Sequence, residues 1–299
     1  MRTIDLEKET REKRLNRLDE ILHRDPGGRG LASAGVKDPV GQLYDALKDV
    51  KRAVLLTGFP VRLPDGRITG ETDGPLGTAD MARALEKSGA QVIVLSDRFC
   101  IRQVEAALRA RGCAAPLKEV PDQDSAAWID RLFDEVSPTH LITLERPGKA
   151  RDGHYYNMRG GIIDAMITDT SMILAAAKRC GTLSIAVGDG GHELGMGALR
   201  PIIEEKVPHG SLICADAAAD ITLVSGVSNW WGSGIAALLS LIHQKDLLPS
   251  PEEVRRVLRA VIASGGADGC TAKAEETVDA LPAETHLEIL AAVRAAIKN

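Results

Sequence analysis

Three ionisable residues lie among glycines in the segment AVGDGGHELGMG, which covers residues 186–197. They are Asp189, His192 and Glu193, whose side chains are of the types that bind metal ions or transfer protons. Five of the twelve residues are glycine, and glycine lets a backbone turn sharply or approach a ligand closely. The segment therefore indicates a nucleotide site, a metal site or a tight turn.

Two specific forms of this site fail on spacing. A dinucleotide fingerprint has the pattern G-x-G-x-x-G, and here Gly188 and Gly190 are followed by Glu193 at the last position, where a carboxylate would repel a pyrophosphate. A zinc protease has the pattern H-E-x-x-H, and here Met196 replaces the second histidine. A hard cation held by carboxylate oxygens fits this segment better.

More acids lie on loops that follow apolar strands. The segment GRITGETDGPLGT (66–78) contains Glu71 and Asp73, and ITLERPGKARDG (142–153) contains Glu145 and Asp152. Each acid alone is better explained as a helix cap or a solvated loop charge. Several acids at one edge would repel each other, and a divalent cation would remove that repulsion. Together they favour a metal site.

Neutral and basic groups that would hold a substrate lie in two further segments. ARDGHYYNMRGG (150–161) contains Asn157 and Arg159, and GVSNWWGSG (226–234) contains Asn229. Arg159 or Arg146 would bind a carboxylate through two parallel hydrogen bonds. The alternative for either arginine is an ion pair with a neighbouring acid.

A strand–helix alternation that begins at residue 39 must position these residues. The strands are expected at 53–57, 91–96, 117–120, 139–145, 183–187 and 221–225, and the helices at 1–25, from 39 onward, 78–89 with Thr78 as N-cap, 98–111, 123–136, 162–179, 234–245, 251–264 and 284–298. Residues 58–78 are expected to form a long loop without a periodic pattern. Trp230 and Trp231 are expected to pack in the core.

This alternation predicts an α/β fold, with a mostly parallel sheet, helices on both faces and a metal site at the carboxyl ends of the strands. Residues 1–38 are expected to form an N-terminal helix and a glycine-rich loop, PGGRGLASAG (26–35), that is mobile or faces a ligand. Residues 39–299 are expected to form a single α/β domain.

Composition restricts the class of protein. The net charge is −5 and no basic run occurs, which argues against a nucleic-acid partner. No apolar run is long enough to span a membrane. The five cysteines form no C-x-x-C pair, which indicates reduced thiols, and acids near the N-terminus disfavour a targeting peptide. We therefore expect a cytoplasmic protein that acts on a small molecule.

Six segments, in the order LLTGFP, GETDGPLGT, LERPG, DGHYYNMRG, GDGGHELGMG and GVSNWWG, resemble the D-glutamate cyclase family, specifically its C-terminal catalytic-type domain. The resemblance implies a manganese-dependent lyase, with magnesium as the alternative metal, that closes D-glutamate to 5-oxo-D-proline with loss of water. The corresponding animal domain belongs to a longer mitochondrial protein. Because no additional N-terminal domain and no targeting peptide are expected in this sequence, we expect a stand-alone microbial form.

The residue inventory suits this reaction, in which the amine of glutamate attacks its own γ-carboxylate. We predict that Glu71, Asp73, Glu145 and Asp189 bind the metal. His192 and Glu193 are predicted to transfer protons, although His192 has a structural role as its alternative. The predicted substrate-binding residues are Asn157, Arg159, Arg146 and Asn229.

Two other functions remain open. A metal-dependent phosphohydrolase would use the same acids, with Arg146, Lys149, Arg151 and Arg159 to hold a phosphate. A non-catalytic module that binds an amino acid or a metal is the second alternative.

Overall fold

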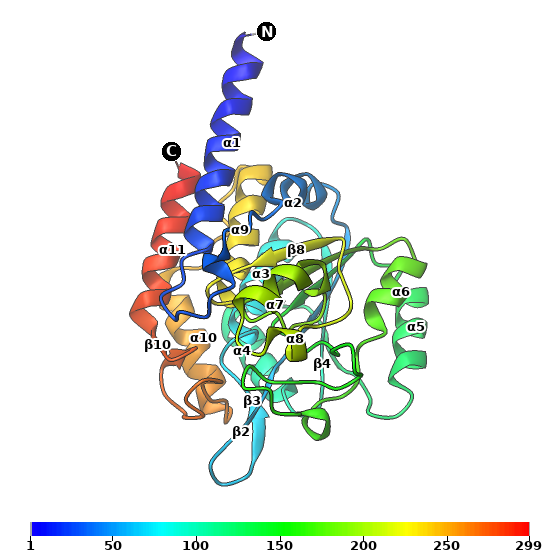
Figure 1. Ribbon diagram of the computed structural model, residues 1–299. Helices are drawn as coiled ribbons and strands as arrows, with labels where there is room; N and C mark the ends of the chain where they lie inside the picture. The colour runs from blue at the N-terminus through cyan, green and yellow to red at the C-terminus, as the bar shows by residue number, and fades with distance from the viewer. Residues whose placement is uncertain (1, 299) are drawn as a thin grey trace.

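A six-stranded parallel sheet forms the centre of the computed structural model, which describes residues 2–298 (Figure 1). The strand order is β5-β4-β1-β6-β7-β8, and every neighbouring pair is parallel. The strands are β1 (Arg52–Thr57), β4 (Gln91–Ser96), β5 (Leu117–Glu119), β6 (His140–Leu144), β7 (Leu183–Gly188) and β8 (Ile221–Val224). The predicted α/β class and parallel sheet are confirmed.

Helices cover both faces of this sheet, as predicted. They are α1 (Arg2–Leu22), α2 (Val40–Leu47), α3 (Pro75–Lys87), α4 (Ile101–Arg111), α5 (Ser125–Val136), α6 (Ile173–Arg179), α7 (Arg200–Lys206), α8 (Gly210–Ile213), α9 (Asn229–His243), α10 (Pro251–Ala263) and α11 (Ala283–Lys298). α5 and α6 pack together on one face, on the side of the molecule opposite α1 and α11 (Figure 1). α3, α4, α9, α10 and α11 form a connected layer on the other face.

The side chains of the central strand alternate between the two layers. Leu55 of β1 belongs to the larger apolar cluster, with α3 and α9, whereas Val54 and Leu56 belong to the cluster with α5 and α6. All three are fully buried. A parallel strand with helices on both faces must be apolar on both sides, which explains the continuous apolar run.

One predicted helix is shorter than expected. Residues 162–179 were expected to be helical, but α6 begins at Ile173 and only a short 3-10 turn, Asp164–Met166, precedes it. The Asp169 carboxylate accepts hydrogen bonds from the backbone N–H and the hydroxyl of Ser171, at 2.9 Å and 2.7 Å. Such local side-chain bonds compete with helical hydrogen bonds, so this polar stretch forms a turn.

Other boundaries also differ from the prediction. The stretch 58–78 is not a structureless loop, because β2 (Pro60–Arg62) and β3 (Ile68–Gly70) form an antiparallel hairpin in it. Thr78 lies inside α3, which begins at Pro75. α9 begins at Asn229 and therefore includes both tryptophans, which are buried as predicted. A second small hairpin, β9 (Thr277–Val278) and β10 (Leu281–Pro282), was not predicted.

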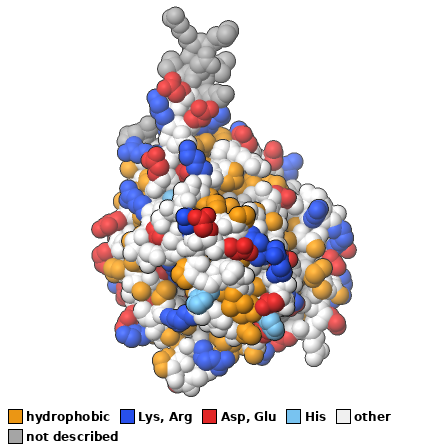
Figure 2. Space-filling model, viewed as in Figure 1, with side chains coloured by type: hydrophobic (Ala, Val, Ile, Leu, Met, Phe, Trp, Pro, Cys, Tyr) orange, Lys and Arg blue, Asp and Glu red, His pale blue; other side chains and the backbone are white. Residues whose placement is uncertain are grey.

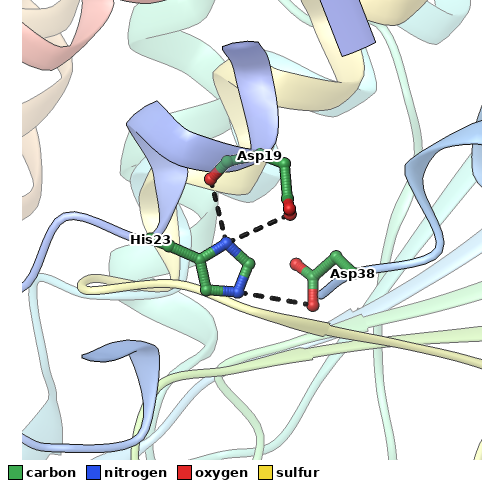
Figure 3. Close-up of side chains that lie close together, drawn as sticks. All are labelled: Asp19, His23 and Asp38. Atoms are coloured by element: carbon green, nitrogen blue, oxygen red, sulfur yellow. Dashed lines mark hydrogen bonds and ion pairs between the residues drawn. The ribbon is translucent and has the colours of Figure 1, made fainter. Parts of the chain in front are cut away.

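The carboxyl end of α1 is tied to the main sheet through His23 (Figure 3). Its Nδ1 lies 2.9 Å from the Asp19 carbonyl oxygen, and its Nε2 lies 3.6 Å from Asp38 Oδ1. The Asp38 carboxylate in turn accepts hydrogen bonds from the Val224 N–H of β8. Burial lowers the pKa of His23, but the two carboxylates outweigh it and raise that pKa to about 9. A protonated His23 therefore joins α1, the following loop and β8.

The surface is mixed in charge. Acidic and basic side chains are interspersed on the face shown in Figure 2, and Ile162, Met172 and Leu212 are the large apolar residues exposed among the described ones. None of the described helices combines the length and apolar character needed to cross a bilayer. All five cysteines are free thiols, as predicted.

α3 and α9 cross at a contact between two glycine backbones. A Cβ added to Gly232 would lie 2.2 Å from the Gly77 carbonyl oxygen, and one added to Gly77 would lie 2.7 Å from the Asn229 Cα. Both distances are far below van der Waals contact. The crossing brings the N-terminus of α9 beside the loop that precedes α3, where Asp73 lies.

We expect Gly232→Ala to lower the free energy of unfolding by about 1–3 kcal/mol, because the two helices would have to separate. Gly41→Ala is the control, since a Cβ at this exposed helical glycine meets no atom within 4 Å. That variant should be as stable as the parent protein or more stable. Urea unfolding followed by circular dichroism measures both, and equal stability of the two variants would contradict the close crossing.

Candidate functional site

Four buried acids converge at the carboxyl edge of the sheet. Glu145 directly follows β6 and Asp189 directly follows β7, whereas Glu71 and Asp73 follow the β2–β3 hairpin. Each of the four residues is at most 7% exposed. Carboxylate oxygens of Asp73, Glu145 and Asp189 lie within 4.8 Å of one another. The structure thus brings together the four acids that were predicted to bind a metal.

The N-terminus of α9 donates hydrogen bonds to three of these acids. The Ser228 N–H lies 3.0 Å from Asp73 Oδ2 and 3.3 Å from Asp189 Oδ2, and the Ser228 hydroxyl donates to Glu145 Oε2 at 2.6 Å. The Asn229 N–H donates to Asp73 Oδ1 at 2.8 Å. A helix N-terminus carries partial positive charge, so it favours carboxylates at this position.

Asp279 is a fifth buried carboxylate of the site, which the sequence analysis did not identify. It lies between β9 and β10 in a left-handed conformation with φ of 55°, and its side chain is 4% exposed. The backbone around it is arranged by Asp268, whose carboxylate accepts hydrogen bonds from the N–H groups of Cys270, Thr271 and Ala280. No motif marks Asp279 in the sequence; its role depends on how the C-terminal segment folds back.

Negative charge accumulates in this centre. Burial, followed by repulsion from Asp279, raises the pKa of Glu71 well above its usual range, and burial raises the pKa of Asp73 and Glu145 in the same direction. Burial likewise raises the pKa of Asp189 to about 6 and that of Asp279 to about 7. Carboxylates so arranged either hold protons or require a cation.

Arg29 supplies positive charge to this centre from the N-terminal loop. Its Nη1 lies 2.5 Å from Asp189 Oδ1, and its Nη2 donates to Asp279 Oδ1 and to Cys270 Sγ. The Asp25 carboxylate holds the loop by accepting from the N–H groups of Arg29 and Gly30, each at 2.9 Å. The glycine-rich sequence predicts a mobile or ligand-facing loop here, but no motif in it indicates a role for Arg29.

The glycine-rich segment is a tight turn built around Glu193. Its carboxylate accepts backbone hydrogen bonds from Asp189, Gly190 and Gly191, at 3.2, 2.8 and 2.7 Å. A Cβ on Gly188 would lie 2.5 Å from Glu193 Oε2, and Gly191 has a φ of +87°. Glycines are therefore needed where the turn wraps closely around this buried carboxylate. The turn also directs Asp189 toward the other acids.

His192 lies in the same turn and faces the cavity. Its Nδ1 is buried without a hydrogen-bond partner and lies 3.4 Å from Glu193 Oε1, while the ring packs edge-on against Phe59. Burial, with the positive charge of Arg29, lowers the pKa of His192 to about 3. Glu145, His192 and Glu193 also form a group whose ligand atoms lie within 4.8 Å of one another. His192 thus presents an unpaired neutral nitrogen beside the acids.

A cavity of about 440 Å³ opens beside the acidic centre. Of the residues predicted for the site, Glu71, Glu145, Asn157, Arg159 and His192 line it. The exposed Arg159 places Nη2 3.0 Å from the Cys270 carbonyl oxygen, and the Asn157 side-chain oxygen accepts from the Arg159 N–H. The cavity wall therefore combines two acids, Glu71 and Glu145, with three arginines, Arg29, Arg62 and Arg159.

Arg146 and Asn229, predicted to bind substrate, have their side chains engaged within the protein. The fully buried Arg146 donates to Asp97 Oδ2 at 2.7 Å, to the Thr168 carbonyl at 2.6 Å and to the Thr170 hydroxyl at 3.1 Å. The Asn229 side-chain oxygen accepts from Gly74 and Gly77, and its amide donates to the Thr72 carbonyl. Neither residue lines the cavity. Through these hydrogen bonds, both hold the loops that carry the acids.

The donor set fits a hard divalent cation. Three carboxylates offer oxygens close together in a buried place, and a ring nitrogen of His192 lies within 4.8 Å of a carboxylate oxygen of one of them, Glu145. Oxygen donors with at most one nitrogen suit manganese or magnesium. The arrangement can therefore bind such an ion and hold a small polar molecule in the adjoining cavity.

We expect Glu193→Gln to lower the free energy of unfolding by roughly 1–3 kcal/mol, because an amide NH₂ would face backbone N–H donors that now have an acceptor. The exposed Glu204→Gln, which weakens one surface ion pair, is the control and should change it little. Chemical denaturation measures both. A Glu193→Gln protein as stable as the control would contradict the role of Glu193 in the turn.

Two solved structures share a weak similarity with this chain. One is a hydrolase of the HAD superfamily, subfamily III A, from Legionella pneumophila, with a TM-score of 0.34 and 12% identity, covering 75% of this chain and 95% of the other. The second is a variant of the actinorhodin polyketide ketoreductase with NADPH, with a TM-score of 0.32 and 14% identity, covering 84% of this chain and 94% of the other. At such low TM-scores neither carries an argument about this chain.

Sequence comparison is decisive for the family. The chain is 30% identical over 243 residues to the human protein named D-glutamate cyclase, mitochondrial; the match covers 77% of this chain and 39% of the human protein's length. The family model described as D-glutamate cyclase-like, C-terminal, matches residues 18–294. The resemblance inferred from the six segments is thereby confirmed, and the chain belongs to the D-glutamate cyclase-like, C-terminal family.

Proposed function

We propose that this protein is a divalent-metal-dependent lyase that cyclises D-glutamate to 5-oxo-D-proline with loss of water. The observation that carries the proposal is the convergence of Asp73, Glu145 and Asp189 in a member of this family, where Glu145 and the neighbouring Glu71 also line a small cavity. The reaction needs a carboxylate to accept a nucleophile, and a cation at such a cluster would assist it.

The metal, manganese or alternatively magnesium, would be held by Asp73, Glu145 and Asp189, with Glu71 at the edge of the cluster. Ser228 and the first N–H groups of α9 keep these carboxylates in place through their hydrogen bonds. When bound, the cation withdraws negative charge from the γ-carboxylate of glutamate and makes its carbon a better electrophile. The buried acids would then recover low pKa values, because a cation favours their charged forms.

The remaining site residues would orient and deprotonate the substrate. Arg159, held by its contact with the Cys270 carbonyl, faces the cavity and is placed to bind the α-carboxylate, with Asn157 beside it. His192 is the group we assign to proton transfer, since it lines the cavity and its Nδ1 has no hydrogen-bond partner. Glu193 would act on the reaction by holding the backbone of Asp189 and of the two glycines that follow it.

Water leaves the substrate when the amine nitrogen bonds to the γ-carbon and one γ-oxygen departs with two protons. The amine supplies these protons, and a proton-transfer group must carry them from nitrogen to oxygen. A cavity of about 440 Å³ is large enough for a curled glutamate, which brings nitrogen and carbon together. The described residues and one cation would therefore supply every group that the proposed reaction requires.

A phosphohydrolase on the same acids is less well supported by the arrangement of basic residues. Of the four basic residues considered for phosphate, Arg146 is buried against Asp97, Lys149 pairs with Asp169, and Arg151 lies 3.7 Å from Asp216. Arg159 alone of these four lines the cavity. Arg29 and Arg62 also lie in the cavity wall, but Glu71 and Glu145 of the same wall would repel a doubly charged phosphate.

Incubation of metal-stripped protein with D-glutamate, with and without manganese, tests the proposal. Chiral chromatography should detect 5-oxo-D-proline when manganese is present and none from L-glutamate. Release of phosphate from p-nitrophenyl phosphate instead would favour the phosphohydrolase. Manganese binding without turnover of any of these compounds would favour a non-catalytic module and contradict the lyase.

His192→Gln should reduce kcat by about 100-fold or more while manganese affinity stays unchanged, because the variant loses the proton acceptor and keeps the carboxylates. His154→Gln is the control, since His154 lies on the surface, pairs with Asp164 and does not line the cavity. Steady-state kinetics and calorimetry with manganese measure the two quantities. Loss of manganese binding in His192→Gln would make His192 a metal ligand and would contradict its assignment to proton transfer.

A further inference from the structure

We infer that Arg29 is an internal counter-cation of the acidic centre, and that a divalent metal ion binds by displacing its guanidinium from Asp189. This inference rests on the metal site of the proposed function and concerns a residue of the N-terminal loop, outside the predicted site. Metal and Arg29 would then compete for the same carboxylate.

The contacts of Arg29 place its charge among the acids. The side chain is 14% exposed, its Nη1 lies 2.5 Å from Asp189 Oδ1, and its Nη2 contacts Asp279 Oδ1. Its positive charge opposes the rise in pKa of Glu71, Asp73, Asp189 and Asp279. In the described structure this guanidinium thus performs the electrostatic task that a metal ion would perform.

The contact with Asp189 leaves little room for a second cation. Asp189 Oδ1 accepts from Arg29, and Asp189 Oδ2 accepts from the Ser228 N–H at 3.3 Å. A metal bound by Asp73, Glu145 and Asp189 would lie close to the guanidinium, and the two positive charges would repel each other in a buried place where water screens them little. Binding of one cation must therefore weaken binding of the other.

The loop around Arg29 is anchored at both ends, and the Asp25 carboxylate holds its backbone at Arg29, so displacement of the guanidinium would involve the side chain and not the whole loop. Gly28 and Gly30 flank Arg29 with φ values of +66° and +92°. Before it, Leu22 accepts hydrogen bonds from the Gly226 N–H and the Ser225 hydroxyl, and after it Asp38 binds the Val224 N–H. The His23 contacts shown in Figure 3 join these two anchors. Displacement therefore needs only a local change at residues 26–35.

Arg29 also lines the cavity, so a displaced guanidinium can move into the cavity. It can keep its contact with Asp279 and turn its other nitrogen from Asp189 toward the space in which a substrate would lie. The exposed Arg159 lies in the same wall and differs in its contacts, since its Nη2 donates to a carbonyl oxygen and not to an acid of the cluster. Competition with a metal is therefore a property expected of Arg29.

Isothermal titration of metal-stripped protein with manganese chloride tests this inference. Arg29→Met should bind manganese more tightly than the parent protein, with Kd lower by roughly 10-fold or more, because the competing charge is gone. Arg29→Lys, which keeps the charge, should remain closer to the parent protein. Lys37→Met removes one positive charge from an exposed position of the same segment and should leave Kd within about twofold.

A second measurement on the same variants separates competition from a structural role. Without metal, Arg29→Met should unfold at a lower temperature than the parent protein, because the acids lose their counter-cation, and manganese should restore much of that loss. A merely structural role for Arg29 predicts weaker manganese binding in the variant, since the site would be disordered. If Arg29→Met does not unfold cooperatively, Arg29→Gln provides the same comparison with a polar side chain.

The possible results distinguish this inference from the proposed function. Unchanged or weaker manganese binding by a folded Arg29→Met or Arg29→Gln protein, with binding by the parent protein, overturns the role of Arg29 and leaves the metal site standing. Absence of manganese binding by the parent protein and by all variants overturns the metal site of the proposed function, and this inference with it. Binding by Arg29→Met without binding by the parent protein supports the competition in its strongest form.

Discussion

Desolvated negative charge at the carboxyl edge of the sheet is the constraint on which the architecture of this site depends. Six carboxylates, those of Glu71, Asp73, Glu145, Asp189, Glu193 and Asp279, are buried there, and water cannot screen their mutual repulsion. The protein compensates with the N-terminus of α9, the Ser228 hydroxyl and the Arg29 guanidinium. This compensation is incomplete, because the pKa values of Glu71, Asp73 and Glu145 stay raised, and a divalent cation would complete it.

Much of the surrounding structure serves to hold that charge in one place. The glycine contact between α3 and α9 brings the helix N-terminus to Asp73, and the turn around Glu193 directs Asp189 toward it. The buried Arg146–Asp97 pair fixes the loop that follows β6. Glu193 and Arg146, which bond to loop groups, thus position the acids of the site. Substitutions of these positioning residues and of the acids are expected to affect the same site.

Both ends of the chain contribute to the centre, although the sheet lies between them in sequence. Arg29 precedes β1, and Asp279 lies between α10 and α11, yet the two side chains form an ion pair. The match to the D-glutamate cyclase-like, C-terminal family runs from residue 18 to 294, so it includes both contributors. The site is therefore a property of the whole folded chain rather than of the strand-end loops alone.

Local pattern in the sequence was sufficient to predict the parallel sheet, the helices on both faces and the edge at which Glu71, Asp73, Glu145 and Asp189 lie, because apolar periodicity and strand-end position are local properties. Local pattern could not show that residues 162–172 lie outside the helix, since an Asp169 turn competes there. Local pattern also could not show which polar side chains are hydrogen-bonded within the protein, or that Arg29 and Asp279 form an ion pair. An ion pair across 250 positions is decided by packing, because only the folded chain brings both ends to one buried point.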